Sequence, residues 1–217
     1  MAELSFPNRL DVIDAVLSAY QAQWRRPATS IFVLDVSGSM RGPRLQAVRA
    51  ALKVLAGADA SSASARYAAF QHRERIVLLP FDDKVDAPTW VRFDGADVEA
   101  ARARVRAVAD GLEARGGTAI FSAIATAEEL ARDELRKDPD RFVSIVLLTD
   151  GESNAGLSLK DFRERYAGST PARVFPILFG EGNPAEMQAL ALLSGGREFD
   201  GRHASLALVF KDIRGYQ

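Results

Sequence analysis

Short runs of apolar residues alternate along the chain with longer segments in which apolar residues recur every three or four positions. The run at 31–34 is apolar at every position, which is typical of a central parallel strand that is covered on both faces. Further strand-length runs follow at 76–81, 142–148 and 174–179, with a short last strand predicted at 197–199. The pattern therefore predicts a sheet whose middle strands are buried on both faces.

Segments with helical spacing separate these strands. The predicted helices cover residues 10–24, 45–55, 97–114, 120–137, 159–166, 184–194 and 206–213. Pro27 ends the first of them. Residues 85–93 are predicted to form a third strand that pairs antiparallel with the second through a turn at 82–84. The Ala/Ser-rich segment 57–72 is predicted to be a surface loop.

Strands and helices alternate along the whole chain, which indicates the α/β class. We predict a doubly wound, mostly parallel central sheet with one antiparallel edge strand and helices on both faces. A length of 217 residues suits one large domain, which we place at residues 28–217 after an N-terminal helix within residues 1–27.

The charge balance and composition remove several classes of protein. The 28 Lys and Arg residues nearly balance the 29 Asp and Glu residues, for a formal net charge of −1, so no broad basic surface for nucleic acid is expected. The absence of cysteine excludes disulfide scaffolds, iron–sulfur sites and thiol catalysis. No apolar run approaches the roughly 18 residues that a membrane span needs, and the first residues do not have the pattern of a signal peptide.

Small oxygen-bearing side chains stand where predicted strands turn into helices. Asp35, Ser37 and Ser39 follow the first strand, and in an extended turn their spacing of two would let them point the same way. Thr118 stands just before a helix, and Asp150 follows the fourth strand. Since ligands of open α/β sheets bind outside the carboxyl ends of the strands, we expect these five side chains to meet there. Such hard oxygen donors, without sulfur or imidazole, select Mg²⁺, Mn²⁺ or Ca²⁺.

Other chemistries fit the sequence less well. No Gly-Lys-Ser/Thr follows a strand, so there is no P-loop, and Ser37 and Ser39 lack the Gly-x-Ser-x-Gly context of a hydrolase nucleophile. We interpret His72 and His203 as ordinary surface residues. The pair Asp82-Asp83 could bind a second cation, but a hairpin turn also explains it.

The string Asp35-Val-Ser37-Gly-Ser39, with Thr118 and the turn around Asp150, resembles the metal-ion-dependent adhesion site of von Willebrand factor type A domains. The resemblance extends from about Thr29 to the end of the chain. It implies that the five side chains surround a divalent cation, Mg²⁺ in the first place, with Mn²⁺ or Ca²⁺ as alternatives. It also implies that one position on the metal stays open for an Asp or Glu of a partner protein.

A narrower resemblance concerns the segments PNRL, RRPATSIFVLDVSGSM, RGGTAIFSAI, VFPILFGE and FKDIRGYQ. They are similar to the C-terminal part of bacterial envelope proteins that join a solute-binding-like domain to a type A domain. This resemblance implies that residues 1–27 are the junction with an upstream domain. It also implies an extracytoplasmic location in the bacterial cell envelope.

These observations predict a metal-dependent protein-binding module rather than an enzyme. Glu152, Ser153 and Asn154 follow the second carboxylate and are candidates for the rim that touches the partner. The first alternative is a metal-dependent hydrolase or phosphoryl-handling enzyme, for which Glu152 or Glu181 would have to act as the base. The second alternative is a structural module whose cation only stabilises the loops.

Overall fold

The structure is a computed structural model, and it describes residues 26–58, 69–70, 72–93, 97–166, 170–180, 182–202, 209–210 and 212–213. The helix predicted at 10–24 and most of the loop predicted at 57–72 lie outside these residues, as do Glu181 and His203. The described residues of the last predicted helix are helical.

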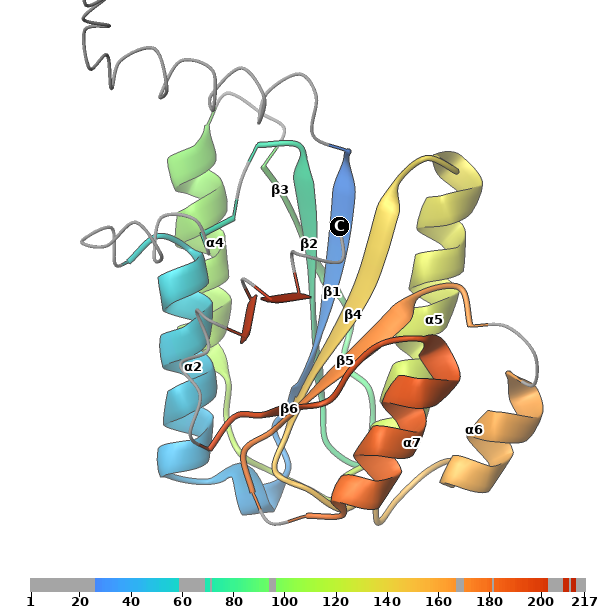
Figure 1. Cartoon of the computed structure of the whole chain (residues 1–217). Helices are drawn as coiled ribbons and strands as arrows, with labels where there is room; N and C mark the ends of the chain where they lie inside the picture. Colours follow the sequence, from blue (N-terminus) through green and yellow to red (C-terminus); the bar gives the residue numbers. More distant parts are fainter. Residues whose placement is uncertain are drawn as a thin grey trace, which may run out of the picture.

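Six strands form one sheet at the centre of the molecule (Figure 1). They are β1 (Ala28–Asp35), β2 (Glu74–Phe81), β3 (Thr89–Arg92), β4 (Phe142–Thr149), β5 (Arg173–Leu178) and β6 (Phe199–Asp200). Their order across the sheet is β3-β2-β1-β4-β5-β6. All neighbouring strands are parallel except β2 and β3, which pair antiparallel at the edge. The predicted fold class is therefore confirmed.

Helices cover both faces of this sheet, as Figure 1 shows. One face carries α2 (Pro43–Leu55) and α4 (Val98–Gly111), and the other carries α5 (Ile120–Lys137), α6 (Leu159–Arg165) and α7 (Pro184–Ser194). The short 3₁₀ helix η2 (Gly38–Met40) connects β1 to α2. Within the part of the chain that the structure describes, no helix combines the length and the apolar character needed to cross a bilayer.

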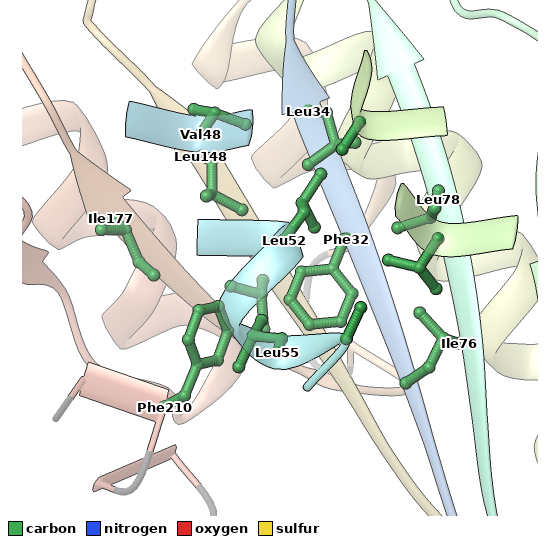
Figure 2. Close-up of a cluster of buried hydrophobic side chains, with 14 of the residues drawn as sticks. Phe32, Leu34, Val48, Leu52, Leu55, Ile76, Leu78, Leu148, Ile177 and Phe210 are labelled. Atoms are coloured by element: carbon green, nitrogen blue, oxygen red, sulfur yellow. The ribbon is translucent and has the colours of Figure 1, made fainter. Parts of the chain in front are cut away.

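Alternation along β1 divides the core between the two faces. Phe32 and Leu34 point into the cluster beneath α2 and α4, which Figure 2 shows in part. Ile31 and Val33 belong to the cluster beneath α5, α6 and α7. All four side chains are buried, and burying an aliphatic or aromatic side chain contributes about 1.5–3 kcal/mol. Phe210 closes the first cluster, with its ring centroid 5.4 Å from that of Phe32.

The third strand is shorter than the sequence predicted. The prediction placed it at 85–93, but β3 covers only Thr89–Arg92, with an isolated bridge between Val85 and Phe81. Pro88 has no N–H to offer to a ladder, so the regular pairing with β2 begins only after it.

The helix predicted at 97–114 also ends early, at Gly111. Leu112 is extended, with φ −64° and ψ 130°, and its side chain is buried. The extended segment carries the chain back to β1, where the Arg115 N–H donates to the Val36 carbonyl at 2.7 Å. The three residues that the prediction assigned to the helix therefore position a loop at the carboxyl end of the sheet.

Candidate functional site

Two loops that follow neighbouring strands meet at the carboxyl end of the sheet. The chain passes from β1 to β2 on one side of β1 and later reaches β4 on its other side. The position between β1 and β4, where the strand order reverses, is the topological switch point of the sheet. In doubly wound sheets, ligands bind at this switch point. Asp35 is the last residue of β1 and Asp150 directly follows β4, so both acids lie at this point. The carboxyl ends of β1 and β4 are at the lower edge of the sheet in Figure 1.

The first loop folds into a 3₁₀ helix rather than the extended turn that the sequence suggested. Ser37 is extended, with φ −61° and ψ 164°, and the Met40 N–H then donates to its carbonyl at 3.0 Å. The backbone N–H of Ser37 donates to Asp35 Oδ1 at 2.8 Å. The 3₁₀ turn still brings the hydroxyl oxygens of Ser37 and Ser39 within 3.0 Å of each other. The turn forms here because the fully buried Met40 anchors its end in the core.

The second loop joins this group through side chains at the end of β4. The Ser39 hydroxyl donates to Asp150 Oδ1 at 2.9 Å. The Thr149 hydroxyl donates to Asp35 Oδ2 at 2.6 Å and accepts the Gly151 N–H at 3.2 Å. Thr149 was not among the predicted site residues, although its place directly before the second acid and at the end of a strand was a signal for a role in the site. Four of the five predicted residues are thereby connected by hydrogen bonds around the switch point.

The fifth residue, Thr118, lies on the adjacent loop and is 3% exposed. The Gly38 N–H donates to the Gly116 carbonyl at 3.1 Å, which ties this loop to the first one. The Thr118 N–H donates to Asn154 Oδ1 at 2.8 Å, and the Asn154 N–H donates back to the Thr118 carbonyl at 2.9 Å. The backbone of Thr118 is therefore fixed between the first loop and the loop after β4.

The predicted rim residues differ in what they contact. Glu152 is exposed beside the site. The Ser153 hydroxyl donates to the Thr118 carbonyl at 3.3 Å, so this side chain and Asn154 both brace the Thr118 loop. Glu152 and Asn154 are both exposed, and the side chain of Asn154 is engaged by the Thr118 loop, so Glu152 is the exposed rim residue left for contact with a partner.

Two buried carboxyl groups dominate the electrostatics of the site. Burial raises the pKa of Asp35 above its ordinary value, hydrogen bonds from Thr149 and Ser37 oppose this rise, and the charge of Asp150 adds to it. Each carboxylate oxygen of Asp35 accepts one hydrogen bond and has a further lone pair to offer. A hard divalent cation would supply the positive charge that these two acids share, so the residues present fit such an ion.

A cation from the chain itself already reaches this site. Arg44, in the first turn of α2, donates from Nη1 to Asp150 Oδ2 and also to the Ser39 carbonyl, the latter at 3.1 Å. The Asp150 side chain is 4% exposed, whereas that of Arg44 is 43% exposed. Nothing in the charge pattern of α2 singled out this arginine.

The neighbouring acidic pair is engaged in a turn. The Lys84 N–H donates to Asp82 Oδ1 at 2.8 Å, and Arg115 Nε donates to Asp82 Oδ2 at 2.7 Å. Burial raises the pKa of Asp82, but these bonds outweigh burial and lower it overall. The turn interpretation of Asp82-Asp83 is supported by these contacts. In the described ranges, no three His, Cys, Asp or Glu side chains group as a metal site, and His72 is exposed.

Comparison with known proteins adds to this geometry. The profile of the von Willebrand factor type A domain matches residues 30–152. The chain is 33% identical over 179 residues to inter-alpha-trypsin inhibitor heavy chain H4 of Sus scrofa, and the alignment covers 78% of this chain and 18% of that protein. A von Willebrand factor type A structure from Catenulispora acidiphila has a TM-score of 0.69 at 21% identity, covering 87% of this chain and 42% of that one. The manganese-loaded TRAP protein of Plasmodium vivax has a TM-score of 0.55 at 16% identity, covering 85% of this chain and 72% of that one.

Fold and site together define a doubly wound α/β domain with an oxygen-rich group of side chains at its switch point. The chain belongs to the von Willebrand factor type A domain family. The structural neighbours share the fold with this chain at low sequence identity. The chain spans about a fifth of the length of the curated relatives that it matches.

Proposed function

We propose that this domain binds a partner protein through a divalent cation held by Asp35, Ser37, Ser39, Thr118 and Asp150. The observation that carries the proposal is a connected set of hydrogen bonds at the switch point. The hydroxyls of Ser37 and Ser39 lead to the Asp150 carboxylate, and the Ser37 N–H and the Thr149 hydroxyl donate to the Asp35 carboxylate. Carboxylates and hydroxyls are ligands that Mg²⁺ and Mn²⁺ prefer. The cation would supply a concentrated positive charge on a molecule whose formal net charge is −1, and this charge would select a partner carboxylate from Asp or Glu.

Several features support an interaction module over an enzyme. The fold is shared with the manganese-loaded TRAP protein of Plasmodium vivax, and the metal is a property of that protein. Glu152 is an exposed acid two residues after Asp150. It makes no hydrogen bond in the part of the chain that the structure describes. A general base needs to be positioned by its neighbours, so Glu152 suits a partner-contacting rim better than proton transfer.

Calorimetric titration with Mn²⁺, repeated with Mg²⁺, tests the site directly. We expect the wild-type protein to bind one ion and the Asp35→Ala variant to bind none, because the variant loses a buried carboxylate that no neighbouring side chain replaces. Asp83→Asn is the matched control, since Asp83 is an exposed acid in the adjacent turn and its loss removes the same charge. We expect it to keep the wild-type affinity within about twofold.

The outcomes separate the three functions. Unchanged affinity in Asp35→Ala would overturn the metal assignment. Unfolding of Asp35→Ala, or of the wild-type protein in EDTA, would favour the purely structural cation. Metal-dependent hydrolysis of p-nitrophenyl phosphate that is lost in Glu152→Gln would favour the enzyme.

A further inference from the structure

Arg44 stands at a position that is unfavourable for its own helix. It is the second residue of α2, and the first turn of this helix contains no acidic residue. The N-terminal end of a helix carries partial positive charge, so an arginine there is repelled by the helix dipole. The place of this guanidinium is therefore set by something other than the helix.

The contacts of Arg44 identify what holds it. Nη1 bonds to Asp150 Oδ2 and to the Ser39 carbonyl, so the guanidinium lies against the same carboxylate that accepts the Ser39 hydroxyl. It neutralises one of the two acidic charges that a divalent cation would neutralise. The side chain is long and 43% exposed, so it can turn outward into water without breaking any packing in the core.

We propose that Arg44 is a built-in competitor for the divalent cation, which pairs with Asp150 in the metal-free domain and is displaced when the metal binds. The inference rests on the proposed metal-binding function and adds a regulating residue to it. Two cations that share one carboxylate bind in competition, and the coupling between them lowers the affinity of each. In the metal-free state, the positive charge of Arg44 reduces the electrostatic repulsion between Asp35 and Asp150. The strength of its ion pair with Asp150 sets the metal concentration at which the metal displaces it.

A positioning role would have the opposite sign. If Arg44 oriented Asp150 for the metal, removing the guanidinium would leave the carboxylate less well placed and weaken metal binding. If Arg44 competes, removing it strengthens metal binding. The direction of the change therefore decides between the two roles.

The experiment is a Mn²⁺ titration of Arg44→Gln by calorimetry at low ionic strength. We expect the Mn²⁺ affinity of Arg44→Gln to be on the order of tenfold higher than that of wild type. Arg44→Lys keeps the charge on a shorter, non-forked group, so its affinity should lie between those of wild type and Arg44→Gln. Arg41→Gln is the matched control, because Arg41 is an exposed residue on the loop three positions before Arg44 and its substitution removes the same charge. We expect the control to stay within about twofold of wild type, since an exposed charge is screened by solvent.

Each result bears on one of the two proposals. If the wild-type protein binds Mn²⁺ and Arg44→Gln binds it equally or more weakly, the competition is overturned while the metal site stands. An equal gain in Arg44→Gln and Arg41→Gln would reduce the effect to net charge and would also overturn it. If no variant, wild type included, binds the ion, the metal site itself fails. Circular dichroism of each variant shows that it is folded.

Discussion

Single buried acids play two different parts in this domain. Asp35 is buried next to a second carboxylate, and both of its oxygens accept hydrogen bonds. Glu128, on α5, is also fully buried, but only its Oε2 accepts a bond, from the Ala172 N–H at 3.1 Å. Its Oε1 has no hydrogen-bond partner among the described residues. Burial accordingly raises the pKa of Glu128 to about 8, against the weaker effects of the Ala172 N–H and Arg132.

This pKa makes the stability of the domain depend on pH. Between the ordinary pKa of 4.5 and about 8, the folded state keeps a proton on Glu128 that the unfolded state has lost. Stability therefore falls as pH rises through this window. Glu128→Gln imitates the protonated carboxyl and removes the fall. Urea denaturation should show that wild type loses about 2 kcal/mol more than the variant between pH 6 and pH 8.

Asp133→Asn is the control for this measurement. Asp133 lies on the same helix, is partly exposed and pairs with Arg136, and its substitution removes the same formal charge. The stability of this variant should follow the pH dependence of wild type. Parallel curves for wild type and Glu128→Gln would mean that Glu128 is ionised in the folded protein.

At the scale of elements, the site depends on a loop that the hydrophobic pattern does not describe. Gly116 has φ +63°, and a β-carbon there would lie 2.8 Å from Asp83 Oδ1 and 3.1 Å from Asp82 Cβ. Its carbonyl accepts the Gly38 N–H and so joins the Thr118 loop to the first loop. The backbone conformation of this one glycine therefore fixes how two loops of the site meet.

Gly116→Ala should destabilise the domain by about 1–2 kcal/mol, the cost of a left-handed conformation for a residue with a β-carbon. It should also weaken Mn²⁺ binding, because the displaced loop carries Thr118. Chemical denaturation and calorimetry measure the two effects. Gly111→Ala is the control, since Gly111 ends α4 with open space around it, and alanine there should be neutral or stabilise by up to about 1 kcal/mol. Equal stability of the two variants would show that the Gly116 conformation is not required.

The elements with strong periodicity were predictable, and the loops between them were not. The apolar runs identified β1, β2, β4 and β5 because the middle of each strand is covered on both faces and consists of consecutive apolar residues. The predicted start of the third strand was wrong because Pro88 has no N–H for the ladder. The predicted end of the helix before Thr118 was wrong because the hydrogen bond from Arg115 to Val36 holds the following segment in an extended conformation. The 3₁₀ turn after Asp35 depends on the burial of Met40, which periodicity does not show.

The candidate site shows the same division. The motif named the five oxygen donors, and the structure joins four of them by hydrogen bonds. Thr149 and Arg44 contact residues more than a hundred positions away in the sequence, and Asn154 contacts Thr118 on another loop. No local pattern predicts such contacts, although Asn154 was a predicted rim residue and the position of Thr149 was a signal. The cell-envelope location and the partner carboxylate stay predictions.

At the scale of the whole molecule, the core and the site are separate. The two apolar clusters lie on opposite faces of the sheet and consist mainly of side chains from strands and helices, whereas the polar side chains of the site lie beyond the carboxyl ends of β1 and β4. Met40 of the first site loop also reaches into the core. Folding energy comes mainly from burial of apolar surface. The metal-free domain is therefore expected to fold, with Arg44 pairing with Asp150 in place of the ion.

Metal should add to this stability by mass action, because the assembled site exists only in the folded state. At Mn²⁺ concentrations about 100 times the dissociation constant, binding contributes about 2.7 kcal/mol. For a domain of this size, that corresponds to a rise in melting temperature of about 5–10 °C, measurable by scanning calorimetry with and without EDTA. Asp35→Ala should melt at the same temperature in both conditions. A domain that fails to fold in EDTA would contradict the separation of core and site, and an equal rise in Asp35→Ala would place the stabilising ion elsewhere on the protein.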